Sequence, residues 1–411
     1  MTAPTMRSPA GPGEQVLPPH LAIGRNRRVA AFVLILVAEF FWSWCWNTVD
    51  LLRPQIRADL GLTLTEAGSA YSAQALGALC GAAIFGQFAD RLGRRAMLVP
   101  VLAGYGIMTL VGLLVESYTG LLAQRFILGA FLGASFPIVV GIFVDLFDQS
   151  IRGRLAALML AVFSLSLVVM GSTLKFVADD WHIMLWIGGV PPIILAVLAL
   201  FVIPNLTPRP NVDGAKFPIT ELFAPAFLRW TLLLTLLCGL NFFAYQAFTG
   251  WMTTYLQEVR GLSDGDAGDM FALQFVGYTI GAFFWGWAAD RYGRRVPAAG
   301  FAIAAVAIFV FLEIPTNSFA LSSVGFVYGF GLSCSVIWGV WLAEIYPSHL
   351  RSTAVSIFHW GRIVSFIAPL VTGVMADSIG LTWAMMTGSV VFAVAIAIWL
   401  ALPETLGKKE T

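Results

Sequence analysis

The sequence predicts an all-α integral membrane protein in which twelve transmembrane helices form two six-helix bundles. Three observations support this fold class: a high apolar content, Lys and Arg residues placed in alternate connections, and a sequence repeat with an offset of 200 residues. Of the 411 residues, 58% are hydrophobic and 11% are charged, which is too apolar a composition for a water-soluble enzyme. The formal net charge of +1 gives no reason to expect nucleic acid as a partner.

Twelve apolar segments are long enough to cross ~30 Å of hydrocarbon at ~1.5 Å per residue. They begin near Val29, Glu66, Met97, Tyr118, Gly153, Ile183, Arg229, Asp266, Val296, Ser318, Ser352 and Leu381. Basic residues gather in alternate connections, such as Arg25 with Arg28, Arg152 with Arg154, and Lys408 with Lys409. By the positive-inside rule, these connections and both termini are expected to be cytoplasmic. We therefore expect a multi-pass protein of a bacterial inner membrane.

The longest polar connection, 204–228, contains five prolines and separates six helices from six. We expect an N-terminal bundle over 29–203 and a C-terminal bundle over 229–402. Residues 1–28, rich in Pro, Gly and Arg, are expected to form a flexible cytoplasmic tail, and 403–411 a second one. The four cysteines lie within apolar segments at spacings that fit neither a disulfide nor zinc, so we expect no metal and no cofactor.

The two halves repeat each other. An offset of 200 carries GLTLTEAG at 61–68 onto GLSDGDAG at 261–268, and GQFADRLGRR at 86–95 onto GWAADRYGRR at 286–295. An offset of 199 carries Asp145 and Arg152 onto Glu344 and Arg351. Two parallel repeats related by an axis along the membrane normal place a binding site between them at mid-membrane.

The ten-residue repeat, called the signature below, combines three residue types with separate roles. A Gly allows close helix packing, an Asp ends a helix at the membrane surface, and two or three Arg lie in a tight turn. The residues are Gly86, Asp90, Arg91, Arg94 and Arg95 in the first copy, and Gly286, Asp290, Arg291, Arg294 and Arg295 in the second. The alternative is that these Arg residues only fix the membrane topology of the chain. The presence of the signature in both halves, with the same spacing, disfavours that alternative.

The signature and the E-x-Y-P-x-x-x-R segment from Glu344 to Arg351 resemble motifs of the major facilitator superfamily. The resemblance implies that signature Asp and Arg residues pair between the two halves and close a cytoplasmic gate in the outward-facing state. The same gate is expected to include Asp145 and Arg152 with Glu344 and Arg351.

Several segments resemble the aromatic acid/proton symporters of that superfamily. They are PQIRADLGLT after the first helix, RFILGAFLGASFPIVVGIFVDLF in the fourth, WHIMLWIGGVPPIILAVLALFVIP in the sixth and GRIVSFIAP in the eleventh. An Asp-Gly-x-Asp motif in the first helix of that family falls at Trp42 and Cys45, so the chain departs from the family there. Any proton coupling then depends on other carboxylates, of which Glu39 is one turn before Trp42.

Basic groups inside apolar segments are candidates for substrate binding, because a buried charge costs at least ~2.5 kcal/mol. Arg362 lies about ten residues into the eleventh predicted helix, near the midplane, where its planar guanidinium could hold a carboxylate. His359 shares its face at i−3. Arg125 in the fourth predicted helix is the second cation. The alternatives are an Arg neutralised by helix carbonyls and a histidine that only packs.

Two carboxylates in the first predicted helix, Glu39 and Asp50, are candidates for proton coupling. Burial favours the neutral acid while a nearby Arg favours the carboxylate, so a group under both influences can load and release a proton. Glu39, near the helix centre, is the favoured carrier. An interfacial position at the helix end is an equally good explanation for Asp50.

Polar pairs on the seventh and eighth predicted helices complete the candidate cavity. Asn241 with Tyr245, and Gln274 with Tyr278, are spaced i, i+4, so each pair shares one helix face. Trp338 in the tenth helix could stack on an aromatic ligand. Hydrogen bonding between helices is the alternative for the polar pairs, and simple packing is the alternative for Trp338.

These features predict a monomeric secondary active transporter and not an enzyme. We expect it to import a small organic anion, an aromatic or related carboxylate, by proton symport and alternating access. A sugar/proton symporter is the alternative, since PETLG at 403–407 resembles the sugar-porter ending, but the paired glutamines of that family are missing from the seventh helix. The fifth predicted helix lacks the G-P-x-x-G-G element of drug/proton antiporters, which disfavours efflux. A transporter-like receptor is disfavoured because we expect no signalling domain.

Overall fold

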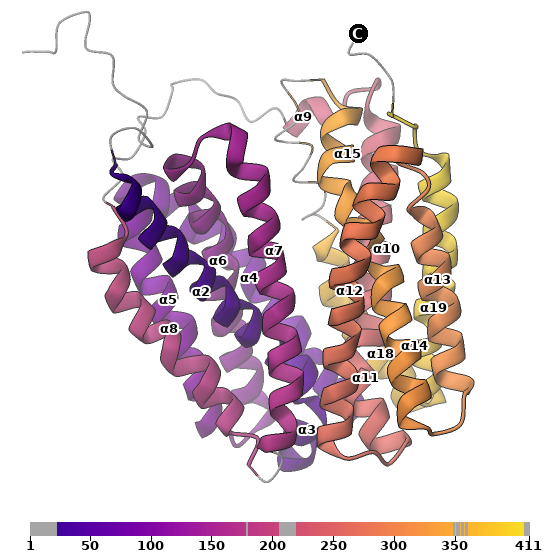
Figure 1. Cartoon of the computed structure of the whole chain (residues 1–411). Helices are drawn as coiled ribbons and strands as arrows, with labels where there is room; N and C mark the ends of the chain where they lie inside the picture. The colour runs from indigo at the N-terminus through magenta and orange to yellow at the C-terminus, as the bar shows by residue number, and fades with distance from the viewer. Residues whose placement is uncertain are drawn as a thin grey trace, which may run out of the picture.

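The structure is a computed structural model that describes residues 23–177, 180–204, 219–347 and 361–406, with the single positions 350, 354 and 357. Within these residues the chain forms helices joined by short connections (Figure 1). Two helical bundles lie beside each other, one drawn from indigo to magenta and the other from red to yellow.

Within the described residues, the first bundle contains seven helices. They are α2 (Arg25–Leu51), α3 (Arg53–Leu60), α4 (Leu64–Leu92), α5 (Arg94–Val111), α6 (Tyr118–Leu146), α7 (Gln149–Thr173) and α8 (Ile183–Val202). Short 3-10 turns η1 (Gly112–Leu114) and η2 (Leu174–Phe176) extend α5 and α7.

In the described residues, the second bundle begins with a short helix, and in two places 3-10 or π-helical turns join its α-helices. Its helices are α9 (Ile219–Leu222), α10 (Leu228–Phe248), α11 (Met252–Thr254), α12 (Asp264–Tyr292), α13 (Ala298–Glu313), α14 (Ser318–Leu332), α15 (Trp338–Ile345), α18 (Arg362–Ile379) and α19 (Leu381–Ala401). The 3-10 turn η3 (Thr249–Trp251) and the π-helical turn η4 (Tyr255–Val259) flank α11, and the 3-10 turn η5 (Ser333–Ile337) joins α14 to α15.

In the described part of the chain, eight helices are long and apolar enough to cross a membrane by length and composition, and two shorter apolar helices accompany them. The starts expected at Tyr118, Ile183, Ser318 and Leu381 are the first residues of α6, α8, α14 and α19. Helices α4 and α12, each 29 residues long, are not among the eight. The prediction of an all-helical membrane fold is confirmed, and the count of twelve spans stays a prediction.

The sequence repeat coincides with matching helix ends. Thr63 caps α4 by accepting a hydrogen bond from Glu66 N at 3.2 Å, and Ser263 caps α12 by accepting one from Asp266 N at 3.1 Å. Both helices end at a signature glycine with positive φ, 96° at Gly93 and 115° at Gly293. A residue with a Cβ would be strained in this conformation.

Each bundle has its own apolar core, and a third apolar cluster joins them. Its buried members include Leu167 and Met170 of α7 and Phe271 and Phe275 of α12. The surface on which the two bundles meet is called the seam below. The bundles lie close together at the end with α3 and α11, the α3 end, and farther apart at the end with the C-terminus, the signature end (Figure 1).

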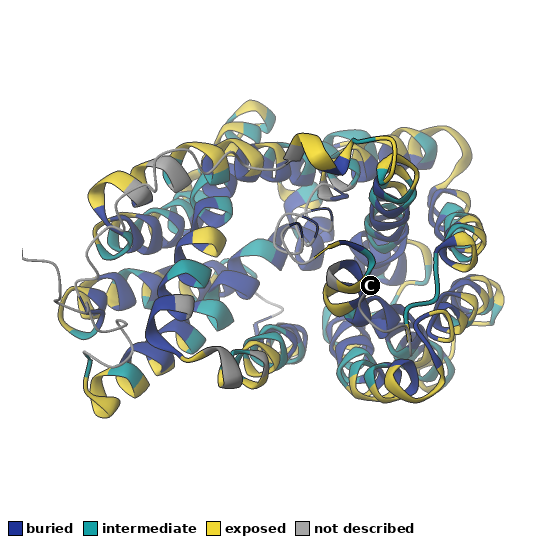
Figure 2. Cartoon of the chain, turned by 90° about the horizontal axis from the view of Figure 1, so that it is seen from above, coloured by how far each residue is buried: buried dark blue, intermediate teal, exposed yellow. Residues whose placement is uncertain are grey.

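Exposed positions gather on the outer sides of the two bundles, while buried positions face their interiors (Figure 2). Phe201, Phe283 and Trp383 have exposed fractions of 73%, 71% and 63%. Large apolar side chains exposed in such numbers are expected on a surface that contacts lipid.

Two repeat-related glycines allow the bundles to touch near the α3 end. A Cβ on Gly68 of α4 would overlap the carbonyl oxygen of Pro369 in α18, and a Cβ on Gly268 of α12 would overlap that of Gly171 in α7. Small residues are used in this way where membrane helices pack backbone to backbone. Since each glycine faces the opposite bundle, the repeat sequence itself sets the distance across the seam.

Replacing Gly268 with Ala is therefore expected to open the seam at the α3 end. Overpacking costs ~1–3 kcal/mol, and ~1.4 kcal/mol is a tenfold change in an equilibrium. We expect about a tenfold faster reaction of a polar thiol reagent with a cysteine placed at the buried Thr254, measured with the exposed Cys80 changed to Ser. Gly339→Ala is the control, because no heavy atom lies within 4 Å of its added Cβ. Equal rates in the two variants would contradict the packing argument.

Candidate functional site

A buried ion pair lies on the seam where α2 ends and α3 begins. Arg53 Nη2 is 2.7 Å from Asp50 Oδ1, and both side chains are 1% exposed. The guanidinium of Arg53 also lies over the ring of Trp251, 4.3 Å from its centroid. Trp251 belongs to the opposite bundle, so Arg53 joins the two halves by a cation–π contact.

Asp50 makes further contacts across the seam. Gln246 Nε2 of α10 is 3.5 Å from Asp50 Oδ2, and Thr253 Oγ1 donates to the Asp50 carbonyl oxygen at 3.0 Å. Trp251 Nε1 in turn donates to Thr372 Oγ1 of α18 at 2.8 Å. The end of α2 is thus held by three neighbouring elements of the second bundle.

Arg125 of α6 is a second buried cation near this pair. It is 2% exposed, and its Nη1 lies 3.1 Å from Thr48 Oγ1 and 3.5 Å from Gln74 Oε1. Its Nε has no hydrogen-bond partner. Within the described residues no carboxylate lies at ion-pair distance from it, so this charge is solvated by neutral groups alone. Because this guanidinium is already desolvated, only the desolvation of the incoming anion would oppose pairing with it.

Aromatic and amide side chains line the second-bundle side of this region. Tyr245 interacts electrostatically with Asp50 and Tyr278, and both tyrosines pack against the seam cluster. Gln274 is buried, and its Nε2 donates to Thr249 Oγ1 at 2.9 Å. Of the predicted i, i+4 pair, Tyr278 therefore packs against the seam, while Gln274 bonds within its own bundle.

The other predicted binding residues have different positions. Asn241 is buried, and its Oδ1 has no hydrogen-bond partner. Trp338 lies in the core of the second bundle, where its ring meets those of Phe301 and Trp399 at centroid distances of 5.8 and 5.0 Å. Glu39 is half-buried on α2 and interacts electrostatically with Tyr105.

Several predicted residues lie outside the described part of the structure. His359 and Arg351 are not described, and Arg362 is described only as the first residue of α18, without its side chain. The side chains of Gly86 and Asp90 are likewise not described. The roles predicted for these five positions stay predictions.

Sequence reasoning missed four residues around the buried charges: Arg53, Gln246 and Trp251 at the seam, and Gln74 beside Arg125. Arg53 could have been found, because it follows Asp50 at i+3, a spacing at which opposite charges meet on a helical turn. The others carry no such local signal, since each meets its partner only through contacts between helices.

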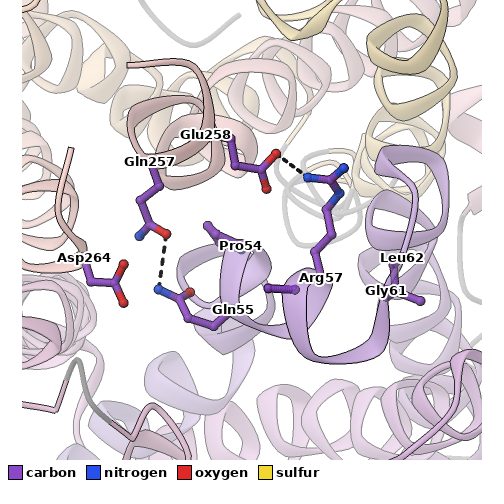
Figure 3. A pocket seen from close by; sticks show the side chains of 9 residues that line it. Pro54, Gln55, Arg57, Gly61, Leu62, Gln257, Glu258 and Asp264 are labelled. Carbon is purple, nitrogen blue, oxygen red and sulfur yellow. Dashed lines mark hydrogen bonds and ion pairs between the residues drawn. The ribbon is translucent and has the colours of Figure 1, made fainter. Parts of the chain in front are cut away.

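A polar layer covers the seam at the surface of the α3 end. Arg57 pairs with Glu258, and Gln55 Nε2 donates to Gln257 Oε1 at 3.3 Å (Figure 3). These residues, with Pro54 and Asp264, line a cavity of about 710 Å³. The cavity lies on the outer side of the closed seam, and neither Asp50 nor Arg125 lines it. It is therefore part of the polar layer that covers the seam and is separate from the buried site.

Two further contacts close the seam on either side of this layer. Asp377 of α18 accepts hydrogen bonds from the backbone N–H groups of Leu64 and Thr65 at 3.1 and 2.9 Å. Lys175 Nζ is 3.2 Å from Asp269 Oδ1. Both contacts join the first bundle to the second.

The signature residues form matching ion pairs at the other end of the molecule. Arg94 Nη1 is 2.5 Å from Asp145 Oδ2, and Arg294 is 2.6 Å from both Asp290 and Glu344. Each pair lies within one bundle. The pairing between halves that the resemblance implies for an outward-facing state is not among the contacts described for this arrangement, in which the bundles are apart at the signature end.

The remaining described signature residues contact their own bundle or are exposed. Arg95 donates to the Leu200 carbonyl, and Arg295 Nε donates to the Leu402 carbonyl at 2.8 Å. Arg152 Nε donates to the Phe147 carbonyl at 3.0 Å. The exposed side chains are Arg91, Arg291 and Asp290. A Cβ at Gly286 would meet nothing within 4 Å, so the close packing predicted for this glycine is not seen in this arrangement.

Glu404 attaches the C-terminal segment to the second signature. It accepts hydrogen bonds from Arg294 N at 2.8 Å and Arg295 N at 3.0 Å, and from Thr405 N and Leu406 N at 3.0 Å. Partial burial alone would raise the pKa of Glu404, but these N–H donors stabilise the carboxylate and hold its pKa below the ordinary value of 4.5.

The stabilisation by Glu404 is expected to depend on pH. Because the folded-state pKa is lowered, the contribution is present above the ordinary pKa and is lost as pH falls through the lowered value. We expect Glu404→Gln to lower the thermal unfolding midpoint relative to wild type, with a gap that is constant above about pH 5.5 and shrinks below about pH 4.5. Glu313→Gln, at an exposed position at the far end of α13, should leave the midpoint unchanged. A gap that persists at low pH would contradict this account.

Comparison with known families identifies the class of protein. The model of the Major Facilitator Superfamily matches residues 35–268 and 261–411, which is most of the chain. The chain therefore belongs to the Major Facilitator Superfamily, and it is a transporter and not an enzyme. Within the described residues no three His, Cys, Asp or Glu side chains are grouped so as to hold a metal ion.

Curated relatives extend over most of the chain at low identity. The niacin transporter NiaP of Acinetobacter baylyi is 28% identical and covers 93% of this chain and 97% of its own length. The 3-(3-hydroxy-phenyl)propionate transporter of Escherichia coli is 26% identical over 82% of this chain and 85% of its own. The 4-hydroxybenzoate transporter PcaK of Acinetobacter baylyi is 26% identical over 75% and 76%. The resemblance to transporters of aromatic acids is thus confirmed.

The fold is shared with solved transporters. A bacterial homolog of the human lysosomal transporter Spinster, solved in an inward-facing and unoccupied conformation, matches with a TM-score of 0.78 at 17% identity over 92% of this chain and 97% of that one. The nucleoside transporter NupG matches with a TM-score of 0.75 at 14% identity over 90% and 99%.

Proposed function

We propose that the chain imports a small organic anion, an aromatic or related carboxylate, together with a proton across a bacterial inner membrane. In this proposal twelve helices cross the membrane and both termini are cytoplasmic, so the α3 end faces outward and the signature end faces the cytoplasm. The arrangement described above, closed at the α3 end, is then the inward-facing state of an alternating-access cycle carried out by a single chain.

The observation that carries this proposal is the buried and unmatched charge of Arg125. A guanidinium in a low-dielectric site is costly unless an anion pairs with it. Its Nε is free of hydrogen bonds, and a planar fork is suited to a carboxylate. Arg362, predicted near the midplane, would act as a second cation for the same ligand, with His359 beside it.

Chemistry shared by the substrates in the relatives' names supports the same class. Niacin, 4-hydroxybenzoate and 3-(3-hydroxyphenyl)propionate each combine an aromatic ring with a carboxylate. Tyr245 and Tyr278 at the seam offer aromatic faces and hydroxyl groups to such a ring. In this proposal Asn241 and Gln274 orient polar ring substituents, and Trp338 supports the site from the core behind it.

Proton coupling is proposed to use Asp50, with Glu39 as the second carboxylate of α2. Asp50 is the stronger candidate because it combines full burial with a guanidinium at 2.7 Å and lies on the surface that separates when the bundles move. A group held between burial and a cation can gain or lose a proton when its surroundings change.

Uptake by proteoliposomes tests the proposal. We expect uptake of radiolabelled 4-hydroxybenzoate to rise on an imposed inside-alkaline pH jump. Arg125→Ala should weaken the apparent affinity by about 10- to 100-fold, because a charge-assisted hydrogen bond contributes ~1.5–3 kcal/mol. Arg125→Lys should restore part of the loss. Arg229→Gln, an exposed arginine at the start of α10, is the control and should transport normally.

The outcomes separate the alternatives. Uptake of the anion that does not respond to the pH jump would contradict proton symport. Proton-driven uptake of hexoses without uptake of aromatic carboxylates would favour a sugar symporter instead.

A thermal-shift screen tests Arg362 independently. Aromatic carboxylates should raise the unfolding midpoint of the wild type, and sugars and amino acids should not. The carboxylate shift should be lost in Arg362→Ala if the guanidinium binds the ligand, and Arg229→Gln should retain it. An unchanged shift in Arg362→Ala would reject this residue as a ligand group.

A further inference from the structure

We infer that Asp50, Arg53 and Arg125 form a charge-matched latch that lets the seam close at the α3 end only when the three groups and any bound ligand carry no more than one net positive charge. The inference deepens the proposed function and rests on its two co-substrates, an organic anion and a proton. It assigns to Arg53 the role of a positioning residue that connects the proton on Asp50 to closure of the seam.

Arg53 is sealed within the closed seam and depends on Asp50 for its counter-ion. It is 1% exposed, it lies over Trp251 of the opposite bundle, and its Nε and Nη1 have no hydrogen-bond partner. Asp50 is its only ion-pair partner in the described part of the chain. If Asp50 became neutral, the buried guanidinium of Arg53 would lose its counter-ion, and the closed seam would lose stability.

Arg125 adds a second positive charge to the same region. Asp50 interacts electrostatically with both Arg53 and Arg125. One carboxylate and two guanidinium groups give a net charge of +1 when Asp50 is ionised. Protonation of Asp50 raises the sum to +2, and binding of a substrate carboxylate returns it to +1.

The other titratable groups that interact with Asp50, Arg53 or Arg125 do not change this sum near neutral pH. They are Cys45 on α2, Tyr71 on α4 and Tyr245 on α10, and thiol and phenol groups stay neutral at pH 7. Glu39 lies 11 residues earlier on α2, about 16 Å along the helix axis. Asp50 is therefore the group whose proton sets the charge of the latch.

This charge rule couples proton entry to binding of the anion without any further gate. The empty carrier with ionised Asp50 and the carrier holding both proton and anion have the same charge, and both can close the seam. A carrier that holds only the proton has one positive charge too many, so its seam stays open to the outside. The proton can then cross the membrane only together with the anion.

The polar layer above the latch explains why closure does not depend on Asp50 alone. Arg57 with Glu258, and Gln55 with Gln257, join α3 to η4 at the surface of the α3 end (Figure 3). These groups are partly exposed and are screened by solvent. They hold the bundles together, whereas the buried charges decide when closure is allowed.

The test measures the distance across the seam in nanodiscs with spin labels on Ala58→Cys and Val259→Cys, at exposed positions on either side. Cys80 is changed to Ser, and the other three cysteines are buried. Without ligand, acidification should shift wild type from the short to the long distance, by about tenfold in the ratio of the two populations per pH unit through the transition. Added 4-hydroxybenzoate at the acidic pH should restore the short distance.

Two variants are expected to change closure of the seam in opposite directions. Asp50→Asn fixes the ligand-free charge at +2, so its seam should stay open at every pH and close with the anion. Arg53→Gln lowers the charge by one, so its seam should be closed at acidic pH without ligand, and proteoliposomes should leak protons in the absence of substrate. Asp59→Asn is the matched control, because Asp59 lies at the same end and bonds to Trp181 of its own bundle. Its pH response should equal that of wild type.

The outcomes separate the latch from the transport proposal. A pH response that survives in Asp50→Asn, or an Arg53→Gln seam that still opens in acid, would overturn the latch. Uptake of 4-hydroxybenzoate without reclosure of the acid-opened seam would also overturn it. If the anion is not transported but the ligand-free responses follow the pattern above, the proposed substrate class is contradicted and the latch is supported.

Discussion

The structure depends on how two buried guanidinium groups are neutralised where the bundles meet. Arg53 and Arg125 each cost several kcal/mol to bury without a counter-ion, yet the described seam provides one carboxylate, Asp50, at ion-pair distance. Trp251 covers Arg53, and Thr48 and Gln74 solvate Arg125, but Arg53 Nε and Nη1 and Arg125 Nε have no hydrogen-bond partner. A site with more buried positive than negative charge favours an anionic ligand, and this follows from electrostatics before any relative is considered.

The repeat gives this site its surroundings. Gly68 and Gly268 occupy the same place in the two halves, and each brings its helix against the backbone of the opposite bundle. Arg94 with Asp145, and Arg294 with Glu344, repeat one ion pair at the far end. The two ends are therefore built differently: at the α3 end the repeat joins the halves, and at the signature end it stabilises each half by itself. Two bundles that are each held together by their own contacts and joined at one end fit the alternating-access cycle proposed above.

Asymmetry within the repeat is as informative as the symmetry. The polar groups that concentrate charge, Asp50, Arg53 and Arg125, all come from the first bundle, while Gln246, Trp251 and Tyr245 of the second supply aromatic and neutral polar contacts. The C-terminal segment is attached to the second signature through Glu404. A ligand held between such halves would meet cations on one side and rings on the other, an arrangement suited to an aromatic carboxylate.

The sequence by itself determined the helical membrane fold, the starts of α6, α8, α14 and α19, and the repeat that relates the halves, because these follow from apolar segment length, capping residues and glycine at positive φ. It also drew attention to Arg125, Asp50, Gln274 and Tyr278, because polar groups in apolar segments stand out; the structure places them in or beside buried contacts, and their roles in binding and coupling stay predictions. Tertiary structure alone decided that Trp338 packs in a core, that Arg53 and Trp251 belong to the seam, and that signature ion pairs lie within each bundle here. Those outcomes depend on which helix faces which, and a contact between residues some 200 positions apart leaves no trace in local sequence.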